Sequence, residues 1–445
     1  MRILHVLANG PPDINGYAIR THNILRSQLS FSGIEPCGLT SPWYPERENM
    51  IEQFEMDGIT YHRCVHPSRI KSVNGWGLKW SSMRGRDRIT GHNSIAKKTI
   101  WKRIISVINK PLRPFFSWIE ERILFKHFTN RIIEVSANCN ADIIHAHVPY
   151  RVGMPALKAA RKLNIPFVYE MRGMWEESAV ASGRWRQGGL AHRRFKRIET
   201  KVMRNADAVI CISETLRQEA ISRGINPDKI TIVPNAVEYN LSESEASNLH
   251  TQVKEKIGDS AVVGYIGSLR KLEGVDSTAE AVSILRNRGI DTKLFVLSSE
   301  SGQSELLAYC EKLGIAEHSI ITGPVPHNQV EPFYNLIDVF VVSRPNKRVT
   351  RLVTPLKPFE AMQAGRAIVM SDLPALAEIV DDGITGRLYP PEDIEKLAEI
   401  IEELLLDDSK RSELGAAASK WIAENRTWEK VVGETTEVYS HLLAD

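Results

Sequence analysis

A lysine and a glutamate three positions apart mark the most distinctive chemical motif of the sequence, residues 357–369. A loop with Pro355 precedes an expected helix that ends at Gly365, and an apolar strand follows. The start of a helix offers free N–H groups and a positive dipole end, which suit a phosphate. Lys357 would add a cation there, and Glu360 would accept hydrogen bonds from ribose hydroxyls. The alternative is an ordinary helix with an acidic residue in its first turn.

Polar residues also follow two apolar strands of the N-terminal half. His145 and His147 are two positions apart, so both side chains should lie on the same face of their strand. Ligands of parallel sheets bind beyond the carboxyl ends of the strands, which favours His147 as a functional residue and His145 as second choice. The alternative is a polar cap on the sheet. Glu170 and Arg172, at the end of another strand, either line the site or only pair with each other.

Two loops carry further candidates. Gly16 ends the loop after the first strand, where the lack of a side chain would let the backbone approach a ligand, or would simply permit a tight turn. A basic stretch, residues 344–351, interrupts an otherwise acidic region and adjoins the expected phosphate site. Its cations would stabilise negative charge there, unless the stretch is an ordinary solvated loop.

The elements that position these residues are short apolar runs alternating with helical stretches, a pattern typical of parallel sheets covered by helices. Twelve strands are expected, at residues 3–7, 58–64, 143–146, 167–170, 208–212, 230–233, 262–266, 293–297, 320–322, 339–342, 367–370 and 386–389. One sheet of twelve strands would be too large, and the pattern restarts at Val262 after a polar stretch. The fold class is therefore α/β, with two doubly wound, Rossmann-like domains and a ligand site in the central cleft between them.

We place the N-terminal domain at residues 1–240 and the C-terminal domain at residues 241–425. Residues 426–445 are expected to form a helix, a candidate to return to the first domain.

The composition, 42% hydrophobic and 25% charged, excludes a disordered or fibrous protein. Five widely separated cysteines lack zinc-like spacing and are typical of reduced thiols in the cytoplasm. The sequence shows neither a signal peptide nor an apolar run long enough to cross a membrane.

Charge is distributed unevenly. Residues 1–240 carry 36 Lys and Arg against 21 Asp and Glu, whereas the remainder carries 21 against 33. The basic excess is concentrated between Arg69 and Arg131, within an aromatic-rich insertion at about 67–130. A basic amphipathic segment with aromatic residues is typical of peripheral contact with an anionic membrane surface. A surface helix packed on the domain core is the alternative, and the absence of a nucleic-acid-binding motif argues against a nucleic-acid partner.

Several motifs, in a consistent order, resemble the family 4 glycosyltransferases, which have the GT-B fold. Those of the C-terminal half are residues 321–326 (ITGPVP), 333–343 (FYNLIDVFVVS) and 357–369 (KPFEAMQAGRAIV). Those of the N-terminal half are residues 142–147 (DIIHAH), 169–176 (YEMRGMWE), 212–214 (ISE) and 232–238 (IVPNAVE). The resemblance covers nearly the whole chain except the basic insertion.

The resemblance implies a retaining transfer of a sugar from a nucleotide-diphosphate sugar to a hydroxyl group. It makes residues 1–240 the acceptor-side domain and residues 241–425 the nucleotide-sugar-binding domain. It implies catalytic roles for His147, Glu360 and Lys357, and acceptor-side roles for His145, Glu170 and Arg172. The expected donor-binding residues are Gly16, Gly267, Ser268, Arg270, Lys271, Arg344, Arg351, Thr354, Pro355 and Leu356. No D-x-D motif occurs, so neither a metal nor another cofactor is expected. The expected acceptor is a lipid-linked or polysaccharide-precursor hydroxyl, and the expected location is the cytoplasmic side of the membrane.

The sequence departs from the common family pattern at two sites. Leu352 stands where the first of two glutamates is usual, eight positions before Glu360. Many relatives have Arg at the position of Ser268 and Lys at that of Glu273, and Arg270, Lys271 or the basic stretch would have to replace them. Two other functions remain open: a sugar-nucleotide epimerase with the same fold, and a catalytically silent scaffold protein.

Overall fold

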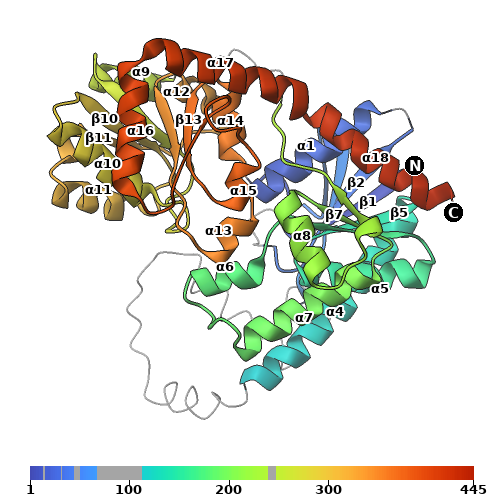
Figure 1. Cartoon of the computed structure of the whole chain (residues 1–445). Coiled ribbons are helices and arrows are strands. Elements are labelled where there is room, and N and C mark those ends of the chain that lie inside the picture. The colour runs from blue at the N-terminus through green and yellow to red at the C-terminus, as the bar shows by residue number, and fades with distance from the viewer. Residues whose placement is uncertain (14–15, 32, 45–50, 68–112, 239–246, 445) are drawn as a thin grey trace.

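The computed structural model describes residues 1–13, 16–31, 33–44, 51–67, 113–238 and 247–444, which form two α/β domains next to each other (Figure 1). Each domain has its own sheet, and the two sheets belong to the two halves of the chain. Most of the basic aromatic insertion, residues 68–112, lies outside the described residues, as do residues 14 and 15 of the loop before Gly16. Among the described helices, none combines the length and the apolar character needed to span a membrane.

The first sheet has eight strands in the order β3-β4-β2-β1-β5-β6-β7-β8. Their bounds are β1 Arg2–Leu7, β2 Glu35–Thr40, β3 Gln53–Met56, β4 Ile59–Arg63, β5 Ile143–His147, β6 Phe167–Met171, β7 Ala208–Cys211 and β8 Ile230–Ile232. The central strands are buried along nearly their whole length, as strands covered on both faces must be.

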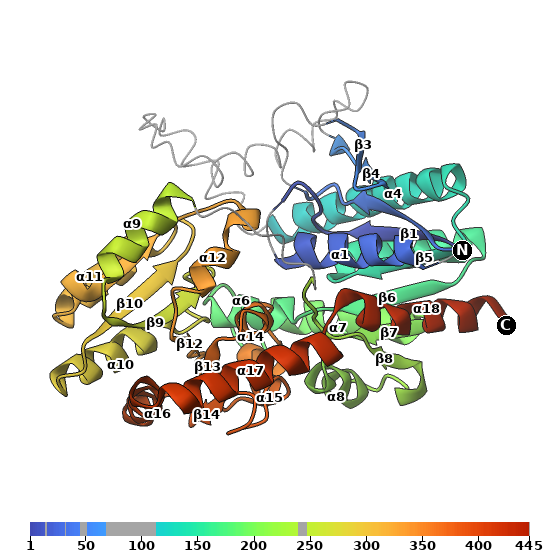
Figure 2. The ribbon, with the colours of Figure 1, turned by 90° about the horizontal axis from the view of Figure 1, so that it is seen from above.

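The helices of this domain are α1 Gly16–Ser30, α4 Arg113–Asn138, α5 Tyr150–Leu163, α6 Trp175–Ala181, α7 Leu190–Asn205 and α8 Glu214–Ser222, with a 3₁₀ turn at Pro227–Lys229. Side chains of α1 pack on one face of the sheet, whereas α4, α5 and α7 contribute to the apolar core on the other face. Figure 2 shows this layered arrangement from above.

The second sheet has six parallel strands in the order β11-β10-β9-β12-β13-β14. Their bounds are β9 Ala261–Ile266, β10 Thr292–Leu297, β11 Ser319–Thr322, β12 Val339–Val342, β13 Ala367–Ser371 and β14 Arg387–Tyr389. The helices are α9 Asn248–Ile257, α10 Val275–Asn287, α11 Gln303–Lys312, α12 Glu331–Tyr334, α13 Arg348–Leu352, α14 Lys357–Gln363, α15 Pro374–Ala377, α16 Ile394–Leu406 and α17 Asp408–Asn425, with 3₁₀ turns at Ala316–His318 and His327–Gln329.

The last helix, α18 (Trp428–Ala444), lies against α1 of the first domain rather than on the second sheet (Figures 1 and 2). Trp428, Val432 and Tyr439 belong to the same apolar cluster as Ile24 of α1. The chain therefore crosses between the domains twice, and its end completes the core of the domain in which it began.

The predicted α/β class with two sheets agrees with the structure, and each of the twelve expected strands has a counterpart. Two strands, β2 and β3, are additional. Pro36 and Gly38 lie inside β2 and leave it without the β-branched run that signals a strand. Strand β3 pairs antiparallel with β4, so the first sheet is mixed instead of purely parallel.

Candidate functional site

Loops that follow strands of both sheets meet at the domain interface. Asn235, after β8, donates hydrogen bonds from Nδ2 to the carbonyl oxygen and Oγ1 of Thr354, at 3.2 and 3.3 Å. A Cβ atom added at Gly16 would lie 3.4 Å from the side chain of Leu356. The expected donor loop at residues 354–356 of the second domain therefore lies directly against the start of α1.

A stack of three buried histidines lies behind this interface. The rings of His145 and His147 are stacked with their centroids 4.4 Å apart, and His5 of β1 lies beside both. Parallel pairing of β1 with β5 places these side chains together on the face covered by α1 and α18. His5 Nδ1 is 3.0 Å from His147 Nε2, and His5 Nε2 is 2.9 Å from Gln28 Oε1.

The histidine stack ends on the C-terminal helix. The hydroxyl of Tyr439 lies 2.6 Å from His145 Nδ1 and 3.2 Å from Gln28 Nε2. Burial is the largest cause that lowers the pKa of each of the three histidines, so the imidazoles are neutral near pH 7. Each neutral ring has one donor and one acceptor nitrogen, which suits a chain of hydrogen bonds.

A buried ion-pair cluster joins the histidines to the interface. Glu170 accepts hydrogen bonds from Arg20 Nη2 at 2.8 Å and from Arg172 Nη2 at 3.0 Å. Burial raises the pKa of Glu170, but the two guanidinium groups outweigh this effect and hold it well below its usual range. Arg20 also donates from Nη1 to Asn235 Oδ1 at 3.1 Å, which links the cluster to the contact with Thr354.

His147 is enclosed by these groups. Its Nδ1 lies 2.6 Å from Arg172 Nη2 and 2.7 Å from Glu170 Oε2, while Nε2 faces His5. Both ring nitrogens are thus engaged by protein groups, and the side chain is almost fully buried. In this conformation His147 contacts Arg172 rather than open space, and Glu170 and Arg172 do pair with each other.

The lysine and glutamate of the sequence motif form a compact cluster at the start of α14. Lys357 Nζ donates to Glu360 Oε2 at 2.9 Å, and the hydroxyl of Tyr334 donates to the same oxygen at 2.7 Å. Burial, followed by the neighbouring carboxylate, raises the pKa of Tyr334 well above its ordinary value, so its hydroxyl remains a donor. Tyr334, on α12, thus fixes the orientation of Glu360, a role that the sequence motif alone did not reveal.

The loop after β9 contains another buried carboxylate, that of Glu273. Glu273 accepts hydrogen bonds from Arg344 at 2.7 and 3.0 Å and from Arg270 at 2.6 Å. Burial raises the pKa of Glu273, but Arg344 and Arg270 lower it further than burial raises it. Of the expected donor residues in this loop, Ser268 contacts Arg270 through its Oγ at 3.3 Å. Arg344 comes from the loop after β12, so the two loops together form a cluster of two cations and one anion with a net positive charge.

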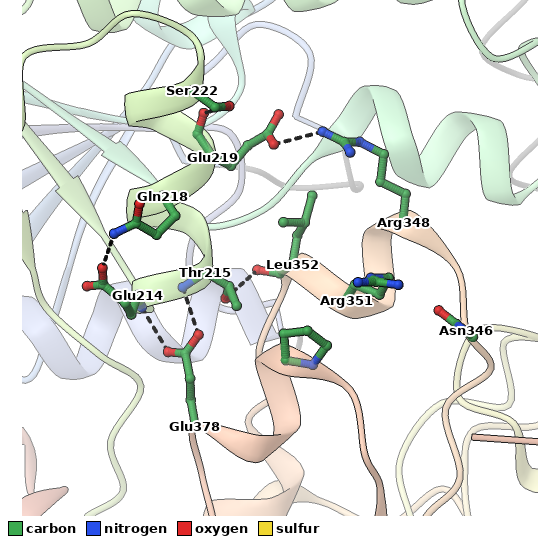
Figure 3. A pocket seen from close by; sticks show the side chains of 11 residues that line it. Glu214, Thr215, Gln218, Glu219, Ser222, Asn346, Arg348, Arg351, Leu352 and Glu378 are labelled. Carbon is green, nitrogen blue, oxygen red and sulfur yellow. Dashed lines mark hydrogen bonds and ion pairs between the residues drawn. The ribbon is translucent and has the colours of Figure 1, made fainter. Parts of the chain in front are cut away.

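Two further arginines of the basic stretch, Arg348 and Arg351, lie at the domain interface. Arg348 crosses the interface and pairs with Glu177 of α6 at 3.1 Å and with Glu219 of α8 at 2.7 Å. Arg348 and Arg351 both line a pocket of about 840 Å³ between α8 of the first domain and α13 and α15 of the second (Figure 3). Glu378 closes one side of that pocket, since its carboxylate accepts the backbone N–H groups of Glu214 and Thr215 at 2.8 and 2.7 Å.

Among the described residues, one cluster of histidines has the spacing of metal ligands, but its surroundings do not favour a metal ion. His5, His145 and His147 place ring nitrogens within 4.8 Å of one another. However, Arg20 and Arg172 already surround the single carboxylate of Glu170 next to them. A divalent cation would add to an uncompensated positive charge in a buried site, which is costly.

Three groups of residues that the sequence assigned to the site also lie close together in the structure, each within its own group. These groups are Gly16 with Leu356, Lys357 with Glu360, and His145 and His147 with Glu170 and Arg172. It did not include His5, Gln28 or Tyr439, which complete the histidine stack. A histidine in an otherwise apolar first strand was the one available signal for His5.

Two protein-family models match successive parts of the chain. The model described as "Glycosyltransferase Family 4" matches residues 96–241, and that described as "Glycosyl transferases group 1" matches residues 248–421. D-inositol 3-phosphate glycosyltransferase of Xylanimonas cellulosilytica is 23% identical over 311 residues, which cover 67% of this chain and 72% of that protein. Glycogen synthase of Mycobacterium tuberculosis is 25% identical over 305 residues, covering 67% of this chain and 68% of that protein.

Solved structures share the fold over the whole chain. Sucrose-phosphate synthase from Thermosynechococcus elongatus superposes with a TM-score of 0.72 at 15% identity, covering 100% of this chain and 99% of that one. HepE from Anabaena, solved with UDP and glucose, gives a TM-score of 0.66 at 15% identity and covers 98% of this chain and 99% of that one.

Proposed function

We propose that this chain, which belongs to glycosyltransferase family 4 and has the GT-B fold, moves a sugar from a nucleotide-diphosphate sugar to a hydroxyl of a lipid-linked or polysaccharide-precursor acceptor at the membrane surface. The family makes the chain a glycosyltransferase. The donor, the retaining stereochemistry and the acceptor are the proposal. The observation that carries it is the oriented carboxylate of Glu360, held by Tyr334 and Lys357 beside the domain interface.

The donor would lie between the loop after β9 and the start of α14. Glu360 would accept hydrogen bonds from the ribose hydroxyls, with its carboxylate already oriented before the donor binds. Lys357 and the cationic pair Arg270 and Arg344 would stabilise the negative charge that builds on the diphosphate as it leaves. These cations support a transfer that needs no metal.

The first domain would supply the acceptor side. Arg172 is fixed by Glu170, His147 and the hydroxyl of Thr21, which accepts from Arg172 Nη1 at 2.5 Å. We assign His147 to orienting this guanidinium, because both of its ring nitrogens are engaged inside the protein. The acceptor hydroxyl would attack the sugar from the face that the diphosphate leaves, with retention of configuration.

A basic and apolar surface on α4 and α7 supports the membrane part of the proposal. Trp118 and Ile123 of α4 are 43% and 42% exposed, and Leu190 at the start of α7 is 89% exposed. The guanidinium of Arg122 lies 4.0 Å from the ring centroid of Trp118. Exposed apolar side chains among cations suit the interface of an anionic bilayer, and the protein would lie on the cytoplasmic face of the membrane without crossing it.

The test is isothermal titration of the purified protein with UDP-, GDP-, ADP- and dTDP-sugars, without added metal. The solved complex of HepE with UDP makes UDP-sugars the first to try. Micromolar binding of one donor supports the proposal and defines the donor class for an acceptor search. Absence of binding across the panel, by protein that is folded by circular dichroism, favours a silent scaffold. Interconversion of the donor without any acceptor favours an epimerase.

A further inference from the structure

Away from the domain interface, two thiols and an imidazole meet at the end of α4. Cys37 of β2 and His62 of β4 lie on the same face of the first sheet, because Leu39 pairs with His62 and Cys37 is two residues before Leu39. Side chains of α4 cover this face, and Cys37 belongs to their apolar cluster. Cys139 directly follows α4, and its Sγ lies 3.7 Å from His62 Nε2.

The end of α4 fixes the position of Cys139. Its backbone N–H donates to the carbonyl oxygen of Val135 at 2.9 Å, so the helical pattern continues through this residue. Asn140 then adopts a left-handed conformation with φ of 47°, which asparagine tolerates better than most residues. The N–H of Ala141 turns back to the carbonyl oxygen of Ser136 at 2.9 Å and closes the turn. Cys139 is therefore held over the sheet by the helix end instead of lying in a free loop.

The surroundings shift the pKa values of the two thiols in opposite directions. Hydrogen bonds from Cys37 and then His62 lower the pKa of Cys139 to about 5, against the effect of partial burial. Hydrogen bonding to the Cys139 sulfur, followed by burial, raises the pKa of Cys37 well above its ordinary value. At neutral pH Cys139 is the thiolate, and Cys37 keeps its proton beside it. Cys139 is also the more accessible of the two, since it is half-buried and Cys37 is buried.

The other three cysteines provide an internal contrast. Cys64, Cys211 and Cys310 are all buried, and burial is the main cause that raises the pKa of each thiol, to about 12 for Cys64 and Cys211. Thiols react as thiolates, so these three are expected to be inert in the folded protein. The chemistry of the five cysteines thus concentrates on one residue and its neighbour.

We propose that Cys139 and Cys37 form a peroxide-reactive pair, with Cys139 as the attacking thiolate and Cys37 as the resolving thiol. The Cys139 sulfur attacks hydrogen peroxide, forming an S–O bond and breaking the O–O bond, and hydroxide leaves and is protonated to water. Cys37 sulfur then attacks the sulfenic acid, an S–S bond forms, and the S–O bond breaks. The proton of Cys37 leaves with that oxygen as a second water. Overall, two thiols and one peroxide give one disulfide and two waters.

The first test measures thiolate reactivity in the folded full chain. Brief treatment with limiting iodoacetamide at pH 6, followed by peptide mass spectrometry, is expected to label Cys139 at least tenfold faster than any of the other four cysteines. His62→Gln should slow this labelling severalfold at pH 6. His127→Gln is the matched control, since His127 lies on α4 and, among the described residues, its ring bonds only the backbone carbonyl of Val65, at 2.9 Å. Equal labelling of all five cysteines, or labelling of Cys139 unaffected by His62→Gln in a folded variant, overturns the proposal.

The second test follows the oxidation product. Stoichiometric hydrogen peroxide should give a peptide cross-linked between Cys37 and Cys139, which a dithiol reductant reverses. In Cys37→Ser the reaction should stop at a sulfenic acid on Cys139, trapped by dimedone. If the parent protein gives only the dimedone adduct, or does not react with peroxide, the proposal that Cys37 and Cys139 form a disulfide is contradicted. Cys211→Ser should behave as the parent does.

Discussion

Arg344 donates two hydrogen bonds to one carboxylate oxygen of Glu273, from Nε at 3.0 Å and from Nη2 at 2.7 Å. The two residues come from the loops after β12 and β9, which are neighbouring strands. Gly274 allows this approach, because a Cβ atom there would lie 1.8 Å from the carbonyl oxygen of Ser343. In the family pattern a lysine is common at the position of Glu273. In the function that we propose, Arg344 supplies the cation instead, and Glu273 positions its guanidinium group.

Replacement of Arg344 by Met should therefore lower stability. It leaves Glu273 buried with one remaining partner, Arg270, whose side chain is 67% exposed. Breaking one side of a buried ion pair costs about 3–5 kcal/mol. Guanidinium denaturation should show this decrease in the free energy of unfolding. The double variant with Glu273→Gln should recover part of it, whereas an unchanged midpoint for Arg344→Met would contradict the buried pair.

Glu360→Ala should weaken donor binding. The ribose would lose hydrogen bonds to a charged group, which are worth about 1.5–3 kcal/mol, or roughly a 10- to 150-fold increase in Kd. Titration with the donor found for the parent protein measures this change. Tyr334→Phe should give a smaller loss, since Glu360 remains but loses the hydroxyl that orients it. Glu331→Ala, on the same short helix as Tyr334, is the matched control, and unchanged donor affinity in Glu360→Ala would remove that residue from the site.

The free energy of unfolding should decrease as the pH rises toward neutrality, because the buried carboxyl group of Glu199 then loses its proton more readily in the unfolded chain. Burial raises its pKa to about 7 in the folded state, from an ordinary value of 4.5. Between these two values the unfolded chain has released the proton and the folded chain has not. Rising pH therefore favours unfolding, and the loss is complete above pH 7, at about 3 kcal/mol.

The measurement compares the parent with Glu199→Gln by chemical denaturation from pH 5 to pH 8. The three buried histidines, whose pKa values are lowered, act in the opposite direction: they destabilise the fold as the pH falls below about 6.5. This effect is common to both proteins, so the difference between them isolates Glu199. A difference that does not grow in favour of the variant as the pH rises would show that Glu199 ionises normally.

Charge removal on α7 should release the protein from anionic vesicles. Arg193, Arg197 and Lys201 lie four residues apart on one exposed face of this helix. Each cation near an anionic surface contributes about 1 kcal/mol, so the triple Gln variant should bind roughly 100-fold more weakly. Co-sedimentation with vesicles containing phosphatidylserine measures the binding. A control with Lys254, Lys312 and Lys420 changed to Gln, all exposed on the second domain, should sediment like the parent, and equal sedimentation of both variants would exclude α7 as the contact surface.

The sequence could predict the strands and strand-end residues because each has a local signal. The alternation of side chains in residues 143–147 was enough to place His145 and His147 on one face. Strand β2 had no such signal, since proline and glycine stand in its centre. The partners of the histidines could not be predicted from local pattern, because Gln28 and Tyr439 are 411 positions apart and meet only when α18 packs on α1. The same holds for Arg344 and Glu273, 71 positions apart in two different loops.

The return of α18 to the first domain also has a consequence for synthesis of the chain. A ribosome makes His5 and Gln28 before the second domain, but it makes their partner Tyr439 only after that domain. Until then the face of the sheet that carries His5 and His145 is covered by α1 but lacks α18, although the strands around it have already emerged. The first domain therefore cannot complete its fold until the second domain has been synthesised. The two domains are separate in space, but they do not fold independently during synthesis.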